Sequence, residues 1–261
     1  MRHFVMTDLE GVAGTDSFAV TRGSGSKSKA PAMDQLGREV NACIQGIHAS
    51  DPEADVTVWD GHGSGGLRER DVEGATYLGE GTPYYELEGF DAMYFVGQHA
   101  MAGTVSAPLR HTYSSTSVAY YRLNDVFVGE FGCRAHIAGM QDVPTVLLTG
   151  DDQACREADM FVPGIETVAV KRGRGVEAAD HMDQDDAVEA VRAGAARAVD
   201  RIDEIDPFEG FDAPYELEIR YRDPIADERS DRPGYESVDP YTVRIVGENP
   251  IDPDDPIHPM M

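Results

Sequence analysis

The chain has 261 residues, of which 41% are hydrophobic, and this is enough material for one large domain with a buried core. Its formal net charge of -26 would repel nucleic acids and anionic membranes, so the composition excludes both as partners. No apolar run is long enough to cross a bilayer and no basic, then apolar leader is seen, so we expect a cytoplasmic protein.

The charged residues are biased in type as well as in number. Aspartate and glutamate together number 48 against 22 lysines and arginines, and the three lysines are Lys27, Lys29 and Lys171. Repulsion among so many acids destabilises a compact state in dilute buffer and is screened by salt. The composition therefore predicts a halophilic protein that salt stabilises. Three cysteines without a Cys-x-x-Cys pair fit a reduced cytosol and no disulfide framework.

Two acidic residues follow the first predicted strand. The apolar run of residues 4–6 reads as a short buried strand, which stops at Asp8, Glu10 and the glycines Gly11 and Gly14. Alternate residues of an extended chain share a face, so both carboxylates can point the same way, which is costly for two anions without a cation between them. The pair is therefore a candidate metal site, with solvated loop carboxylates as the alternative that this stretch leaves open.

The rest of the chain alternates between helical and extended patterns. Residues 15–33 have no apolar period and are expected to form a surface loop, and from Asp34 the apolar residues recur at helical spacing, with Asp34 as the N-cap. Further patterns predict strands at 54–59, 92–96, 143–148 and 168–170, a hairpin of 118–121 and 126–128, helices at 133–139, 153–160 and 183–205, and strands at 215–221 and 241–246.

This order of elements predicts an α/β fold, with a mostly parallel central sheet flanked by helices and a smaller C-terminal α+β portion. We expect residues 1–206 to form the α/β core and residues 207–247 to form the β-containing C-terminal portion. The tail of residues 248–261 is dense in proline and aspartate, so it is expected to be disordered.

Two histidines follow later strands as the acids follow the first. His62 comes shortly after the strand at 54–59, and His99 directly follows the strand at 92–96. The carboxyl ends of parallel strands lie along one edge of a sheet, where open α/β folds build their sites. A lone histidine after a strand is more often structural, but two of them in this position predict convergence with the acid pair. Glu130 repeats the pattern just past the second hairpin strand.

The glycines around His62 support a different interpretation. Gly61, Gly63 and Gly66 match the Gly-x-Gly-x-x-Gly pattern of a dinucleotide-binding turn. The match is weak because residues 67–71 do not open an apolar-faced helix and because the motif follows the second strand instead of the first. A dinucleotide-binding protein that uses Gly61–Gly66 is the first alternative function.

Taken together, the motifs resemble the zinc D-aminopeptidase family of the dipeptide-transport-operon type. The resemblance runs in order from residue 1 to about residue 205, and it rests on MTDLEG at 6–11, DGH at 60–62, GQHA at 97–100, RHTYS at 110–114, VGEFG at 128–132, DVP at 142–144 and TGDD at 149–152. It implies a two-zinc peptidase on an α/β scaffold that removes N-terminal D-amino acids from short peptides. It also implies a ring-like homo-oligomer, such as a decamer.

The resemblance also assigns roles to individual residues. Carried over position by position, the family's active-site histidine falls on His111 and its metal ligands fall on Asp8, which bridges both ions, Glu10, His62, His99 and Glu130. The family has a further helix after the strand at 241–246, where this chain has its proline- and aspartate-rich tail. The oligomer contacts and part of the substrate pocket are therefore expected to differ.

The donor set agrees with zinc chemistry. Two histidines and three carboxylates suit two borderline divalent ions and leave a net charge of about +1. Two ions roughly 3.5–4 Å apart can hold a hydroxide between them and polarise a scissile carbonyl. His111 could relay a proton, stabilise an oxyanion or act as a nucleophile, and the sequence leaves these roles open. A non-catalytic metal- or peptide-binding relative is the second alternative function.

Overall fold

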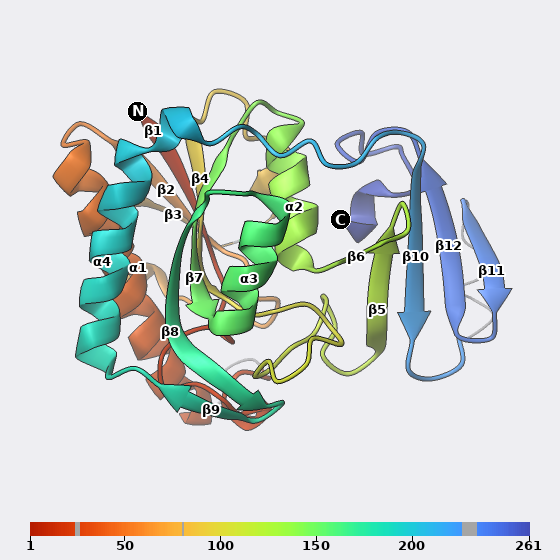
Figure 1. Cartoon of the computed structure of the whole chain (residues 1–261), viewed down its shortest axis with the longest axis horizontal. Helices are drawn as coiled ribbons and strands as arrows, with labels where there is room; N and C mark the ends of the chain where they lie inside the picture. The colour runs from red at the N-terminus through yellow and green to blue at the C-terminus, as the bar shows by residue number, and fades with distance from the viewer. Residues whose placement is uncertain (24–26, 80, 226–233) are drawn as a thin grey trace.

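The computed structural model describes residues 1–23, 27–79, 81–225 and 234–261, and a seven-stranded sheet forms their centre (Figure 1). Its strand order is β3-β2-β1-β4-β7-β8-β9, and each pair of neighbours is parallel except β8 with β9. The expected mostly parallel sheet is therefore confirmed. The strands are β1 (Arg2–Thr7), β2 (Asp55–Asp60), β3 (Thr76–Leu78), β4 (Ala92–Gln98), β7 (Thr145–Asp151), β8 (Glu166–Gly175) and β9 (Ala178–His181).

Helices cover both faces of this sheet. Figure 1 shows α1 (Ala30–Ser50) and α4 (Gln184–Asp200) on one face, and α2 (Glu130–Gly139) with α3 (Asp152–Phe161) on the other. Every residue of the central strands β4 and β7 is buried. Because both faces of these strands are covered, they read in the sequence as continuous apolar runs instead of alternating patterns.

A second, antiparallel sheet lies at the far end of the molecule from α1 and α4 (Figure 1). Its strands, in the order β11-β12-β10-β5-β6, are β11 (Tyr235–Asp239), β12 (Thr242–Gly247), β10 (Tyr215–Tyr221), β5 (Val118–Leu123) and β6 (Val126–Val128). The predicted hairpin is thus present, but it pairs with the C-terminal strands. The second sheet therefore contains strands from both sides of residue 206, the expected boundary between the α/β core and the C-terminal portion.

The first helix starts earlier than its pattern indicated. It begins at Ala30, and Pro31 occupies its first turn, where the missing N–H of proline costs no hydrogen bond. Asp34 is not the N-cap but lies inside the helix and pairs with Arg68. The expected loop at 15–33 contains two short 3-10 helices, Phe18–Val20 and Lys27–Lys29, and its residues 24–26 lie outside the described part of the chain.

The C-terminal tail is folded, contrary to the expectation of disorder. Ile257 is fully buried, and only 1% of Met261 is exposed. The Asp255 carboxylate accepts hydrogen bonds from the backbone N–H groups of Glu248 and Asn249, which turns the tail back on itself. Composition alone misses this arrangement because a few buried apolar residues and local aspartate turns hold a segment that is otherwise polar.

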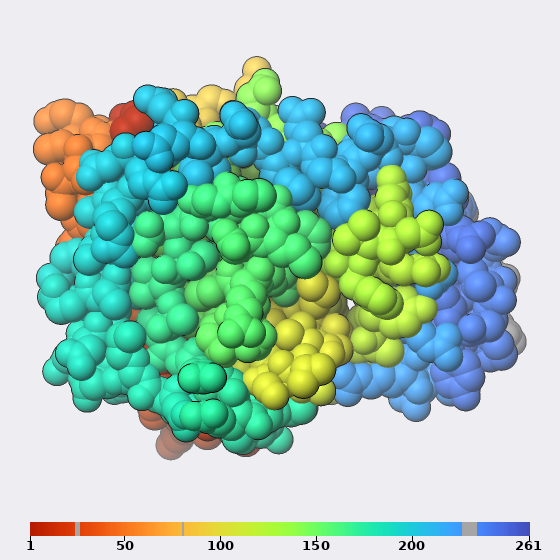
Figure 2. Space-filling view, viewed as in Figure 1, coloured from red at the N-terminus to blue at the C-terminus, as the bar shows by residue number. Residues whose placement is uncertain are grey.

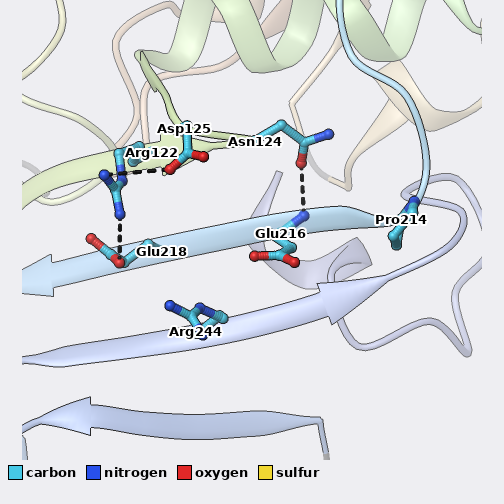
Figure 3. A pocket seen from close by; sticks show the side chains of 7 residues that line it. All are labelled: Arg122, Asn124, Asp125, Pro214, Glu216, Glu218 and Arg244. Atoms are coloured by element: carbon cyan, nitrogen blue, oxygen red, sulfur yellow. Dashed lines mark hydrogen bonds and ion pairs between the residues drawn. The ribbon is translucent and has the colours of Figure 1, made fainter.

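The surface shows one hollow on the second sheet that is separate from the predicted site. Its volume is about 280 Å³, and Figure 3 shows Arg122 in it, pairing with both Glu218 and Asp125. Arg244 lies across from them on β12. On the face in Figure 2, the loop after β4, in yellow, fills the surface between α3 and the β5–β6 hairpin. Within the described residues, no helix has both the length and the apolar character to cross a membrane.

Candidate metal centre

The predicted site lies at the point where the strand order reverses. Strand β1 sits between β2 and β4, so the chain leaves its carboxyl end with one parallel neighbour on each side. Such a switch point is where open α/β sheets bind ligands. Asp8 follows β1, His62 follows β2 and His99 follows β4, so the three meet at this edge as expected.

Asp8 faces one histidine with each of its oxygens. Asp8 Oδ1 lies 3.0 Å from His62 Nδ1, and Asp8 Oδ2 lies 3.2 Å from His99 Nε2. Glu10 joins the first of these contacts, because its Oε2 also lies 3.0 Å from His62 Nδ1. Asp8 thus stands between two clusters of donors, as a bridging carboxylate would.

Glu130 and His111 complete the second cluster. Glu130 is the first residue of α2, and its Oε1 lies 3.4 Å from His99 Nε2 and 3.8 Å from His111 Nε2. The Tyr113 backbone N–H donates to the same oxygen at 2.8 Å. Nitrogen and oxygen atoms of His99, His111 and Glu130 lie close enough together to hold one ion, so His111 has the position of a ligand as well as of a proton carrier.

Two glycines allow these loops to approach each other. A Cβ on Gly11 would lie 2.2 Å from the Gln98 carbonyl oxygen, and a Cβ on Gly97 would lie 2.2 Å from the Asp8 carbonyl oxygen. Gly97 also has a φ of +80°, which side chains rarely tolerate. The acids after β1 reach the end of β4 because both positions lack a side chain.

The carboxylates of the cluster respond to burial and to the histidines. Burial raises the pKa of Asp8 to about 6, and the neighbouring charge of Glu10 adds to the rise. Burial also tends to raise the pKa values of Glu10 and Glu130, but interactions with the histidines outweigh this effect. Interaction with His62 holds the pKa of Glu10 well below its usual value, and interaction with His99 lowers the pKa of Glu130 to about 2.

The pKa values of the histidines show that the buried carboxylates favour positive charge beside them. Burial opposes protonation of His62 and His99, yet the adjacent carboxylates raise the pKa of His62 to about 11 and that of His99 to about 10. Burial, followed by the charge of His99, lowers the pKa of His111 to about 4. A divalent cation between the carboxylates would meet the same electrostatic demand and leave the imidazoles neutral.

The donor atoms of this cluster fit metal ions. Among the described residues, Asp8 Oδ2, Glu10 Oε2 and His99 Nε2 are buried, and their short contacts do not have the geometry of hydrogen bonds. Unsatisfied buried polar atoms are costly, and a bound ion is one of the arrangements that explains them. His99 Nδ1 contacts the Ala100 carbonyl oxygen at 2.9 Å, which directs the lone pair of Nε2 into the cluster. Imidazole and carboxylate together suit zinc.

The outer contacts of His62 come from the glycine-rich loop itself and from the segment 15–33, which the sequence predicts to be a surface loop. His62 Nε2 lies 3.0 Å from the Thr21 carbonyl oxygen and 3.1 Å from Ser64 Oγ. Lys29 is buried, and its Nζ donates to Ser64 Oγ at 2.7 Å. These contacts fix the ring so that Nδ1 faces the carboxylates.

Two buried cations near the site were also missed. Lys171 Nζ donates to the carbonyl oxygens of Glu10, Val12 and Thr15, and so holds the loop after β1. Burial lowers the pKa of Lys171 to about 8. The sequence did contain a signal for this role, because Lys171 directly continues the apolar run 168–170.

Arg134 is the second of these cations. It is buried one helical turn after Glu130, and its guanidinium carbon lies 4.0 Å from the ring centroid of Tyr84 and 5.2 Å from that of Trp59. The described residues include no carboxylate within ion-pair distance of Arg134, so the aromatic faces replace a salt bridge. Nothing in the sequence around Arg134 indicated this enclosure.

Backbone conformation marks the segment around His111. Leu109 and Tyr113, each two residues from His111, have φ values of 51° and 56° in the left-handed region. Both make contacts that the site uses, since the Leu109 carbonyl oxygen meets His111 Nδ1 at 2.8 Å and the Tyr113 N–H binds Glu130. Strained residues of this kind cluster at functional sites.

The glycine-rich loop of residues 61–66 does not have the structure of a dinucleotide-binding turn. No α-helix follows it, because only a short 3-10 helix, Glu69–Asp71, separates β2 from β3 in the described chain. The N–H groups of Gly66 and Leu67 donate to the Asp60 carboxylate. The amides that would meet a pyrophosphate are therefore already used, and the dinucleotide alternative loses its support.

The cluster opens into a cavity of about 290 Å³. Its walls include Asp8, Glu10, His62, His111 and Glu130, together with Arg22, Gly23, Gly61, Gly63, Ser64, Tyr113, Ser114, Ser115 and Thr116. A cavity of this size lies at the small end of the range for small-molecule sites. His99 lies beneath it, since only 2% of this residue is exposed.

Comparison with known proteins gives consistent matches. The family model described as D-aminopeptidase matches residues 1–252. The D-aminopeptidase of Bacillus subtilis (strain 168) is 30% identical over 181 residues, which span 66% of this chain and 64% of that protein. The aligned part is thus less than two thirds of that relative's length. The solved structure of the Zn-dependent D-aminopeptidase DppA from Bacillus subtilis, described as a self-compartmentalizing protease, matches with a TM-score of 0.86 and 26% identity, covering 95% of this chain and 92% of that chain.

Proposed function

The chain belongs to the D-aminopeptidase family, and on this basis we propose that it is a zinc-dependent aminopeptidase that removes the N-terminal residue, of D configuration, from short peptides. The observation that carries the proposal is the position of Asp8, whose two oxygens face His62 and His99 separately. A carboxylate in this position can join two ions, since Glu10 contacts His62 on one side of it and Glu130 contacts His99 on the other.

We assign two zinc ions to the chain on this basis. His62 and Glu10 would hold one ion and His99 and Glu130 the other, with Asp8 between them. Zinc bound there would polarise the peptide carbonyl and make an attacking water molecule more acidic. The small cavity supports a peptide substrate of few residues, and the zinc-dependent relative supports zinc as the metal.

The chain's own residues can manage the proton that hydrolysis requires. His111 Nδ1 lies 2.8 Å from the Leu109 carbonyl oxygen, so Nε2 is the nitrogen that faces the cavity and can accept a proton. Glu130 Oε1 is 3.8 Å from this nitrogen and is held in place by the Tyr113 N–H. A proton taken up on Nε2 can be returned to the leaving amine, which is the task of a general base that becomes a general acid.

Metal counting and activity together test this proposal. Zinc content per chain would be measured for the wild type and for Asp8→Asn, Glu130→Gln and the exposed control Asp55→Asn, alongside cleavage of D-alanyl-D-alanine. We expect two zinc ions for the wild type and the control, one for Glu130→Gln, and fewer than one for Asp8→Asn, with activity only where two remain. Full zinc content without turnover would favour a non-catalytic metal- or peptide-binding relative.

Two broader expectations belong to the same proposal. The self-compartmentalizing relative supports a ring-like homo-oligomer for this chain, and sedimentation would distinguish a ring from a monomer. The 48 acidic residues against 22 basic ones support a halophilic protein, and the three free cysteines support a cytoplasmic location.

A further inference from the structure

An arginine stands at the mouth of the cavity without an anionic partner. Arg22 is exposed and lines the cavity, and no carboxylate of the described residues lies within ion-pair distance of its guanidinium. The chain has a net charge of -26, and the three carboxylates of the metal cluster lie in the same cavity. An unpaired cation in such surroundings points to an anion that arrives with the ligand.

Contacts within the protein hold this guanidinium in a fixed orientation. Arg22 Nε donates to Ser115 Oγ at 2.9 Å, and Nη2 donates to the Ser115 carbonyl oxygen at 3.1 Å. The guanidinium carbon lies 3.8 Å from the centroid of the Phe18 ring. Among the described residues Nη1 has no hydrogen-bond partner, so one donor edge remains for a ligand.

The same contacts tie Arg22 to the site. The Phe18 ring meets the His111 ring edge to face, with 6.1 Å between their centroids. Ser115 and the neighbouring residues Ser114 and Thr116 line the same cavity as His111. Phe18 and Ser115 therefore hold Arg22 in a defined position relative to His111.

We propose that Arg22 binds the C-terminal carboxylate of the peptide substrate and so selects short peptides with a free acid end. The inference rests on the proposed peptidase function and names the substrate class of that site. Guanidinium groups bind carboxylates strongly, and such bonds are charge-assisted. Arg22 and the carboxylates of the metal cluster line the same cavity of about 290 Å³, which has room for a peptide of a few residues.

Arg22 also fixes the direction in which the peptide lies. A dipeptide carries an amine at one end and a carboxylate at the other, and zinc ions accept either group. A carboxylate held by Arg22 stays away from the metal cluster, which leaves the N-terminal end and its amide bond beside Asp8 and His111.

The test compares D-alanyl-D-alanine with its C-terminal carboxamide. Both are assayed with zinc-loaded wild type, Arg22→Met and Arg22→Lys, at the lowest KCl concentration that keeps the wild type folded. Arg156→Met is the matched control, because Arg156 is an exposed arginine on α3 with no carboxylate partner in the described part of the chain, and its loss changes the net charge equally. Melting temperatures of all variants check that folding is unaffected.

We expect Arg22→Met to raise KM for the free acid by about tenfold, the loss typical of one charge-assisted bond, with kcat within about twofold of wild type. The carboxamide should show no such rise, Arg22→Lys should fall between, and Arg156→Met should resemble the wild type. An equal rise for both peptides, or no rise for the free acid, overturns the inference.

A binding measurement separates this inference from the peptidase proposal. Calorimetric titration of both peptides into zinc-loaded protein that carries His111→Ala needs no turnover. Weaker binding of the free acid alone after Arg22→Met supports the role of Arg22 even if hydrolysis fails in every assay. Equal binding of acid and carboxamide, with or without Arg22, contradicts it.

Discussion

The imidazole rings of His99 and His111 stack face to face, with 3.9 Å between their centroids and 15° between their planes. The two rings also share a carboxylate, because Glu130 Oε1 faces the Nε2 atom of both. His99 is sealed beneath the cavity, whereas His111 lines it. Of the two stacked rings, His111 is therefore the one that can reach a bound peptide.

Replacing His111 separates its two possible roles. His111→Ala is expected to lower kcat/KM by at least about a hundredfold, the usual contribution of a positioned acid or base, while two zinc ions remain bound. Enzyme assays and zinc analysis of the same preparations check this. His48→Ala is the control, because His48 contacts the Gly74 carbonyl oxygen and is not one of the residues that line the cavity. Loss of one zinc ion from His111→Ala would show that His111 is a metal ligand instead.

Lys171 is expected to matter for stability through the loop after β1. Lys171→Met removes the donor that satisfies three carbonyl oxygens and leaves the nearby acids Glu39 and Asp151 less compensated. We expect the free energy of unfolding to fall by about 3 kcal/mol, the cost of stranding buried polar groups. Urea unfolding measures it, with the exposed Lys27→Met as the control. Equal stability of the two variants would argue against this role.

His136 should make stability fall in acid. It is buried between Phe208, Phe211 and Tyr215, and burial lowers its pKa to about 4 despite the nearby charge of Asp212. Because the unfolded chain binds the proton near pH 6.5, the stabilisation is complete above pH 6.5 and is lost as the pH falls toward 4, amounting to about 3 kcal/mol.

Comparison with a variant isolates this contribution from other titrating groups. The stability difference between wild type and His136→Gln, measured by urea unfolding at pH 7 and pH 4.5, should shrink at the lower pH. A difference that stays constant across this range would mean that His136 binds its proton equally well in both states.

Salt should stabilise the protein. With 48 acidic residues against 22 basic ones, repulsion among exposed carboxylates is reduced when the Debye length falls from about 30 Å at 0.01 M to about 3 Å at 1 M. The melting temperature should therefore be higher in molar KCl than in dilute buffer. Greater stability in dilute buffer would contradict a halophilic character.

The strands and their ends were predictable because the signals are local. The buried strands β1, β2 and β4 are apolar runs, and parallel pairing brings their carboxyl ends to one edge. This is why Asp8, His62 and His99 could be expected to meet. The position of Glu130 at the first residue of α2 was less clear, because its strand belongs to the other sheet.

The parts that were missed depend on contacts between distant residues. Strands β3, β9 and β11 are short edge strands with few apolar residues, so their sequences show no clear apolar periodicity. Arg22 and Lys29 lie in a polar segment without a pattern, and only tertiary contacts with Ser115 and Ser64 place them at the site. The tail folds back because Ile257 finds a place in the core, which no local pattern shows.

The most direct test of the central claim is hydrolysis of the para-nitroanilides of D-alanine and L-alanine, in molar KCl, by zinc-loaded wild type and by Asp8→Ala. These substrates have no C-terminal carboxylate, so the result does not depend on Arg22. A metal-dependent D-aminopeptidase should release nitroaniline from the D-substrate with the wild type alone. Equal release by Asp8→Ala, or release from the L-substrate only, would contradict the assignment.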